Sequence, residues 1–338
     1  MSKIKICMQL SYLLILMLVG ILSSCQQARV PKIGFLIPNL KVDRYAKEKV
    51  FFTERIVQLG GEALVASAEN DDMLQIKQAK DMIAQGADVL VINSINRFTA
   101  AAIVRIANEE GVKVIAYDRL ISNSDLDYYI SFDSEKAGEL MAEYAVKKCP
   151  AGNYLIFGGD KSDLNALLLK NGQLNVLKQY IGSGKIKVEY SIFVEDWSEA
   201  NAQHEIKNYL DLSTEQPVAI ISSYDGMSSG IIRTLKEYGL EGKVLLTGQD
   251  AEITACQNIV KGYQSMTIFK SFKKLAYSAA DLSMNILKSS NLAENSVKIY
   301  NGKIEVPSIL LEPIVVDINN LKTTVIAEGL LSESDVYN

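Results

Sequence analysis

The chain has 338 residues, with 35 basic and 40 acidic side chains, one histidine and a formal net charge of −5. This length is too great for one ordinary core and suits two domains of about 150 residues each. The acidic balance offers no basic face to a nucleic-acid partner. A single histidine, without CxxC or HxxxH spacings, also argues against a zinc site.

The N-terminus has the parts of an export signal. Lys3 and Lys5 precede an uncharged run from Leu10 to Leu22, and this run is too short to span a bilayer comfortably. The ending Leu22-Ser23-Ser24-Cys25 resembles the bacterial lipoprotein signal, in which the cysteine thiol is acylated. We therefore expect residues 1–24 to be a lipoprotein signal peptide and Cys25 to carry the lipid. An ordinary signal peptide with a chance cysteine is the alternative.

Removal of residues 1–24 would leave two cysteines besides the anchor, Cys149 and Cys256. In an oxidising compartment these two could pair. A large exported domain does not need such a bridge, and we expect free thiols.

From Pro31 onward, short apolar runs with strand character alternate with segments of helical spacing. The first series of expected elements consists of strands at Lys32–Ile37, Glu62–Ser67, Val89–Ile92 and Val112–Tyr117 and helices at Arg44–Leu59, Asp72–Gln85 and Ala100–Glu110. The run Val89–Ile92 is apolar throughout, which is typical of a strand buried on both faces of a parallel sheet. Alternation of this kind predicts βαβ units.

The alternation restarts after the weak stretch Ser131–Pro150. The second series consists of strands at Asn153–Phe157, Ile186–Val194, Val218–Ser223, Val244–Thr247 and Met266–Phe269 and helices at Asn165–Tyr180, Glu199–Tyr209, Met227–Tyr238, Ile253–Val260 and Lys273–Leu287. No Pro/Ser-rich linker separates the two series. The fold class is therefore α/β, with two lobes joined by short crossings.

Polar side chains follow strand after strand of these series. The strand-end residues are Asn93-Ser94, Asp118-Arg119, Gly158-Gly159-Asp160, Tyr224-Asp225, Gly248-Gln249-Asp250 and Lys270. In open parallel sheets, ligands bind beyond the carboxyl ends of the strands. Charged groups bond paired hydroxyls, and the rings of Tyr45, Trp197 and Phe272 can cover C–H faces, so this set predicts a site for a small polyhydroxylated ligand. At any single position, the alternative is a residue that caps the next helix.

Enzyme interpretations fit less well. Residues 226–230 match G-x-S-x-G, but a hydrolase of that fold needs a histidine after its serine, and His204 precedes it. Asp118 and Asp250 could form a carboxylate pair for glycoside hydrolysis. Each has a basic neighbour, Arg119 or Lys270, which favours two ionised hydroxyl acceptors. No nucleotide-binding glycine loop is present, and we expect a protein that is not an enzyme.

Several segments together resemble the bacterial periplasmic sugar-binding proteins of the ribose, galactose and xylose type, and the xylose branch most of all. These segments are Asp88–Ile92, Ala116–Arg119, Tyr129–Asp133, Ser183–Val188, Gly248–Ala251 and Met266–Lys270. The resemblance implies the type I fold, with two Rossmann-like lobes joined by three hinge crossings that close over a sugar. The lobes it implies are residues 25–134 plus 270–312 and residues 135–269 plus 313–338.

By the same resemblance, sugar contacts fall on Arg44, Asp118, Arg119, Asn165, Asp250 and Lys270, with stacking at Tyr45 and Trp197. Tyr45 stands where the xylose type has a tryptophan, and the chain departs from the xylose pattern at two further places. Tyr224 stands where the family has an asparagine, and Pro38-Asn39 stands where the xylose type has two acidic residues.

The resemblance also implies a function. It implies a periplasmic protein that captures a monosaccharide (D-xylose or another pentose) and delivers it to a membrane ABC permease. With the lipoprotein signal at Cys25, we expect a lipid-anchored monomer without a cofactor. The alternative is a subunit that presents bound sugar to a membrane sensor kinase.

Overall fold

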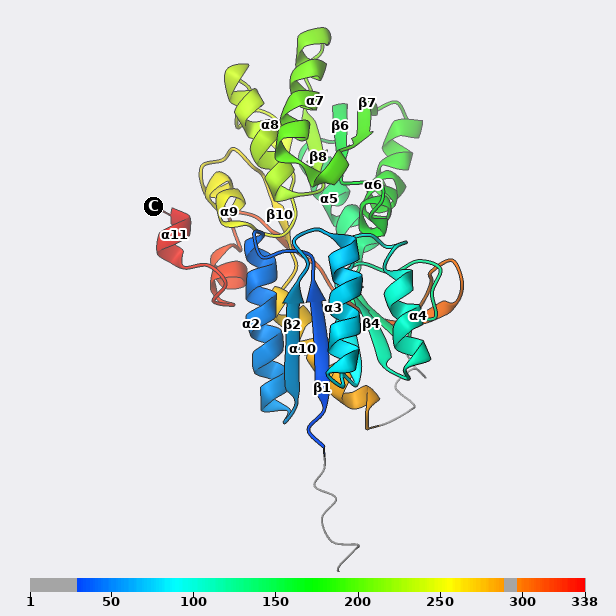
Figure 1. Ribbon diagram of the computed structural model, residues 1–338. Coiled ribbons are helices and arrows are strands. Elements are labelled where there is room, and N and C mark those ends of the chain that lie inside the picture. Colours follow the sequence, from blue (N-terminus) through cyan, green and yellow to red (C-terminus); the bar gives the residue numbers. More distant parts are fainter. Residues whose placement is uncertain (1–28, 289–296, 338) are drawn as a thin grey trace, which may run out of the picture.

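The computed structural model describes residues 29–288 and 297–337, so the predicted signal peptide and Cys25 lie outside the described residues. Two α/β lobes lie end to end, one coloured mainly blue and cyan and the other mainly green and yellow (Figure 1). The predicted α/β fold with two lobes is confirmed. The exact lobe boundaries stay a prediction.

The first lobe is built on one mostly parallel sheet. Within the described residues its strands run in the order β11-β12-β5-β4-β3-β1-β2, and β11 alone is antiparallel to its neighbour. The bounds are β1 Lys32–Ile37, β2 Glu62–Ser67, β3 Val89–Ile92, β4 Lys113–Tyr117, β5 Tyr128–Phe132, β11 Val297–Tyr300 and β12 Glu305–Leu311.

Helices cover both faces of this sheet. They are α2 (Asp43–Gln58) and α10 (Phe272–Ile286) on one face and α3 (Asp72–Ala84) and α4 (Ala101–Glu109) on the other. Phe52 of α2 and Leu275 of α10 pack in one core cluster, while Met82 of α3 and Ile103 of α4 pack in another. Burial on both faces explains why the strands read as continuous apolar runs.

The second lobe repeats this plan on a smaller parallel sheet. In the described part of the chain its strands run in the order β7-β6-β8-β9. Its elements are β6 Gly152–Gly158, β7 Ile186–Phe193, β8 Ala219–Ser222, β9 Leu245–Leu246, α5 Ser134–Lys148, α6 Leu164–Gly182, α7 Glu199–Leu212, α8 Asp225–Glu237 and α9 Ile253–Val260. A separate antiparallel pair joins β10 (Thr267–Phe269) to β13 (Ile314–Val316).

Within residues 29–288 and 297–337, the chain passes between the lobes at three places. It leaves β5 for α5 at Asp133, leaves β10 for α10 at residues 270–271, and leaves β12 for β13 at residues 312–313. The final segment contains the π-helix Lys322–Ile326 and α11 (Glu333–Tyr337), and α11 packs on α9. Among the helices described, none is long and apolar enough to cross a bilayer.

Most predicted elements are present to within two or three residues, but no element was predicted in the weak stretch Ser131–Pro150. That stretch holds the end of β5 and the whole of α5. The inward face of α5 consists mainly of small residues, among them Ala137, Gly138 and Ala142, so its apolar signal is weak. Gly138 lies against α6, where an added Cβ would be 2.0 Å from the carbonyl oxygen of Leu169.

Cys149 and Cys256 are not bonded to each other in the described structure. Cys149 packs at the edge of the core beneath α5 and α6, whereas Cys256 lies in the cluster under the C-terminal segment. Burial raises the pKa of the Cys256 thiol to about 12.

Candidate functional site

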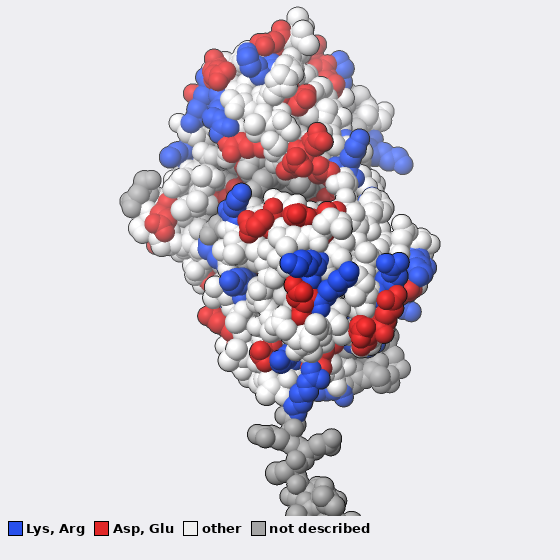
Figure 2. Space-filling view, in the orientation of Figure 1, with Lys and Arg blue, Asp and Glu red and all other residues white. Residues whose placement is uncertain are grey.

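A cleft of about 960 Å³ lies between the two lobes. Figure 2 shows the molecule hollowed at this level, with acidic side chains along both edges of the hollow. The carboxyl ends of parallel strands from each lobe point toward it, which is where such sheets place ligands. Its size is near the upper end of the range of about 300–1,000 Å³ for small-molecule sites.

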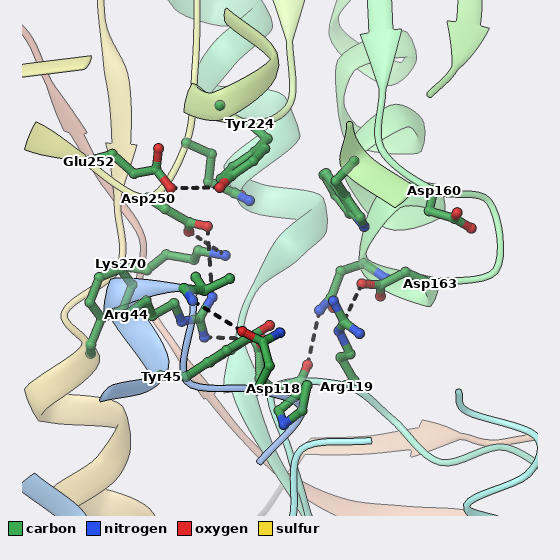
Figure 3. Close-up of a pocket in the computed structure, with 18 of the residues that line it drawn as sticks. Arg44, Tyr45, Asp118, Arg119, Asp160, Asp163, Tyr224, Asp250, Glu252 and Lys270 are labelled. Carbon is green, nitrogen blue, oxygen red and sulfur yellow. Dashed lines mark hydrogen bonds and ion pairs between the residues drawn. The ribbon is translucent and has the colours of Figure 1, made fainter. Parts of the chain in front are cut away.

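Arg44, in the first turn of α2, is the centre of the charged network. Its Nε donates to Oε1 of Glu48 at 2.8 Å, and a terminal nitrogen lies 3.0 Å from Oδ2 of Asp118. The other terminal nitrogen lies 3.8 Å from Oδ2 of Asp250, which belongs to the opposite lobe (Figure 3). The guanidinium also lies 4.8 Å from the centroid of the Phe272 ring. One guanidinium therefore joins three carboxylates from three elements.

Asp118 follows β4 in a left-handed backbone conformation, with φ of 62°. Burial raises the pKa of its carboxyl, but the opposing effect of Arg44 and Lys270 is greater and the net shift is downward. Asp118 is therefore an ionised acceptor rather than an acid with a raised pKa.

Asp250 also has a left-handed backbone, with φ of 96°, and its Oδ1 lies 2.9 Å from Nζ of Lys270. The loop that carries Asp250 is held in place by hydrogen bonds to the fully buried Asp225. Asp225 accepts hydrogen bonds from Gln264 (2.8 Å), Thr267 (2.9 Å) and the backbone N–H of Glu252 (3.0 Å). The burial of Asp225 raises the pKa of its carboxyl.

A second set of contacts joins the lobes on the other side of the cleft. Arg119 Nε lies 3.2 Å from Oδ2 of Asp163. The Asn165 side-chain amide donates to the carbonyl of Asp118 at 3.0 Å, and its oxygen accepts from Ser134 Oγ at 3.0 Å. These bonds tie the start of α6 to β4 and to the first crossing.

Aromatic side chains form the wall of the second lobe. Trp197 and Tyr224 meet edge to face, with ring centroids 6.2 Å apart and planes at 87°. The Tyr224 hydroxyl donates to Oε1 of Glu252 at 2.6 Å (Figure 3). Gly226 lies directly under the Tyr224 ring, where an added Cβ would be 2.4 Å from Cε1.

All the residues predicted as ligand contacts line this one cleft: Arg44, Tyr45, Asp118, Arg119, Asn165, Trp197, Tyr224, Asp250 and Lys270. Arg119 lowers the pKa of Asp118, as expected of its basic neighbour, but the cation in direct contact with Asp118 is Arg44, and Arg119 forms its ion pair with Asp163. The G-x-S-x-G serine, Ser228, is fully buried and donates to the carbonyl of Thr247 at 2.8 Å.

Sequence reasoning missed two acidic residues that line the cleft, Asp163 and Glu252, and a third, Glu48, that lies behind Arg44. Of these three, only Glu48 could have been predicted from the sequence, because it stands four residues after Arg44 on the same face of a predicted helix. Asp163 caps α6 by accepting from the backbone N–H of Asn165, a function that its sequence position alone does not separate from ligand binding. The described residues hold no group of three or more metal-ligating side chains placed to bind an ion.

The fold and the cleft define a class: a two-lobed α/β binding protein whose site lies between its lobes. Comparison with known proteins supports the same class. The family model of the periplasmic binding protein domain matches residues 33–291. The D-xylose-binding periplasmic protein of Haemophilus influenzae is 40% identical over 327 residues, which cover 96% of this chain and 98% of that protein.

Two further comparisons agree. The D-xylose-binding periplasmic protein of Escherichia coli is 40% identical, over 91% of this chain and 93% of that protein. An ABC transporter solute binding protein from Clostridium phytofermentans, solved with bound β-D-glucose, superposes with a TM-score of 0.83 and 30% identity, over 90% of this chain and 99% of that chain. The chain therefore belongs to the periplasmic binding protein family, and the resemblance predicted from its sequence is confirmed.

Proposed function

We propose that this protein captures a monosaccharide, D-xylose or another pentose, by closing its two lobes, and that it delivers the sugar to a membrane ABC permease. The observation that carries the proposal is the arrangement of Arg44, Asp118, Asp250 and Lys270 beside the aromatic wall. Carboxylates accept from sugar hydroxyls, cationic groups donate to them, and rings cover C–H faces. The names of the two relatives at 40% identity support xylose and a periplasmic location.

Tyr224 favours a pentose over a hexose. Its ring lines the cleft, and its hydroxyl is held by Glu252, so the ring has a fixed position. An asparagine here would be shorter and would offer an amide to the ligand. We expect the ring to occupy the space that the extra hydroxymethyl group of a hexose needs.

Calorimetry with xylose, ribose, arabinose, glucose and galactose tests the sugar class. We expect the wild type to bind a pentose most tightly and Tyr224→Asn to gain hexose affinity. The control is Tyr300→Asn, since Tyr300 is 61% exposed on β11 and does not line the cleft. Equal binding of hexoses and pentoses by the wild type would refute the steric explanation, and no binding of any sugar would refute the proposed function.

The choice of membrane partner needs a cellular experiment. Deletion of the gene should abolish uptake of the labelled sugar if the closed form serves a permease. Loss of the transcriptional response with normal uptake would favour the sensor-kinase alternative.

We propose in addition that Cys25 carries a lipid anchor in the periplasm. Cys25→Ser should move the protein from the membrane fraction to the soluble fraction, because acyl chains supply most of the membrane affinity of such a protein. Cys149→Ser is the control and should stay with the membrane. Retention of the Cys25 variant in the membrane would contradict the anchor.

A further inference from the structure

Glu48 is a fully buried carboxylate one helical turn beyond Arg44 on α2. Its Oε1 accepts from Arg44 Nε at 2.8 Å, and the hydroxyl of Tyr117 lies beside it. Burying a charged carboxylate costs free energy unless its partners compensate. Glu48 bears this cost directly beside Arg44, the central cation of the cleft, so we expect its carboxylate to have a function in the site.

The geometry of Arg44 indicates what the Glu48 carboxylate does. A guanidinium is a rigid planar fork, so a bond at Nε fixes the direction of both terminal nitrogens. With Nε held by Glu48, the terminal nitrogens lie 3.0 Å from Asp118 and 3.8 Å from Asp250. These are the two cleft carboxylates, one from each lobe.

We propose that Glu48 is a positioning residue for the cleft: in its ionised form it fixes the plane of Arg44, so that sugar affinity is highest when Glu48 carries its charge. The inference rests on the proposed sugar-binding function, which it deepens. Glu48 acts through Arg44 and does not line the cleft itself.

The groups that face Glu48 come from several elements. Arg44 and Tyr45 lie on α2, Tyr117 and Asp118 come from the end of β4, and Asp250 and Lys270 reach the same network through Arg44. Burial raises the pKa of Glu48 to about 7, although Arg44 opposes the shift. Burial also raises the pKa values of Tyr45 and Tyr117, and the net pKa shift of Asp118 is downward, so none of these three changes its charge near neutrality.

The raised pKa of Glu48 determines the direction in which sugar affinity changes with pH. At pH 6 most Glu48 is protonated and its bond to Arg44 is weaker, whereas at pH 8 most of it is ionised. Affinity should therefore rise between pH 6 and pH 8. Burial also raises the pKa values of Asp225 and Asp163, but Asp225 contacts the loop that carries Asp250, Asp163 pairs with Arg119, and neither contacts Arg44.

Calorimetry with D-xylose at pH 6, 7 and 8 provides the test. We expect wild-type affinity to rise several-fold across this range, and Glu48→Gln to bind about tenfold more weakly at pH 8 without pH dependence. Glu48→Asp keeps the charge and should keep part of the pH dependence. Glu54→Gln, an exposed position on the same helix, should behave as the wild type.

A second measurement without sugar examines the positioning itself. The Nε–H proton of Arg44 should be protected from exchange in NMR spectra of the wild type at pH 8 and unprotected in Glu48→Gln. Wild-type affinity and pH dependence in Glu48→Gln, or an equally protected Nε–H, would overturn the inference. Failure of the wild type to bind any pentose at pH 8 would instead overturn the proposed function, while the NMR result would still decide the role of Glu48.

Discussion

Two glycines determine how closely the aromatic wall packs on the second lobe. An added Cβ at Gly159 would lie 2.2 Å from the Trp197 ring, and one at Gly226 would lie 2.4 Å from the Tyr224 ring. Each ring therefore packs directly against the backbone of a glycine. The wall depends on residues that carry no side chain.

Gly159→Ala should displace Trp197, because the new methyl group and the indole ring cannot share the space. Trp197 is only partly buried and can swing outward, so we expect sugar affinity to fall about tenfold with little change in melting temperature. Calorimetry and thermal unfolding measure the two effects. Gly182→Ala is the control, since nothing lies within 4 Å of that position, and wild-type affinity in Gly159→Ala would exclude Trp197 from the ligand contact.

The pattern of polar residues at strand ends predicted which residues line the site better than it predicted which ion pairs they form. Asp118, Asp250 and Lys270 each follow an apolar strand, and the topology of a parallel sheet brings such positions to one edge. Pairing was harder to predict, because Arg44 is far from Asp118 and Asp250 in sequence. The sequence shows the adjacent Arg119, which does lower the pKa of Asp118, but only the fold shows that Arg44 lies 3.0 Å from its carboxylate.

At the scale of elements, α5 and α6 make the closest helix contact in the second lobe. Gly138 of α5 faces the Leu169 carbonyl, and Gly172 of α6 faces the Glu135 carbonyl, each with 2.0 Å to an added Cβ. Both contacts involve backbone, which cannot move aside as a flexible side chain does. The reciprocal glycines therefore fix the spacing of the two helices.

Gly138→Ala should destabilise the protein by about 1–3 kcal/mol, the usual cost of forcing extra volume into a packed core. Thermal unfolding should show a melting temperature lower by several degrees. Lys147→Ala lies on the exposed face of the same helix and should change stability by less than about 0.5 kcal/mol. Equal stability of Gly138→Ala and the wild type would mean that α5 and α6 can separate without cost.

The same small residues explain where element prediction failed. Long apolar strands such as Val89–Ile92 and well-capped helices such as α3 carry their own signal, and both were predicted. Helix α5 buries alanine, glycine and serine, so its amphipathic pattern is faint. The hairpin of β11 and β12 was also missed, since most of its residues are partly or fully exposed.

At the scale of the whole molecule, the lobes are joined by polar contacts as well as by the chain crossings. The pairs Arg44–Asp250 and Arg119–Asp163 and the bond from Asn165 to Asp118 all cross from one lobe to the other. Charged and polar residues line this boundary together with aromatic and aliphatic ones, and its ion pairs can be exchanged for bonds to water or to a ligand. A boundary of this kind suits repeated opening and closing.

X-ray scattering should detect that motion. We expect a smaller radius of gyration in saturating sugar than without it, because the ligand bonds to both lobes and favours the closed state. Asp163→Ala should need more sugar for the same change, since it removes one inter-lobe partner, whereas Arg233→Ala on the surface of α8 should not. Identical scattering curves with and without bound sugar would contradict closure.

The chain contains one tryptophan, and it is the Trp197 of the aromatic wall. All indole fluorescence of this protein therefore originates at the edge of the cleft, with the ring of Tyr224 at 6.2 Å and solvent on its open side. A molecule that covers the ring removes water from it and shifts its emission, without any label attached. The protein thus has an internal optical reporter, and single replacements elsewhere in the chain leave its source unambiguous.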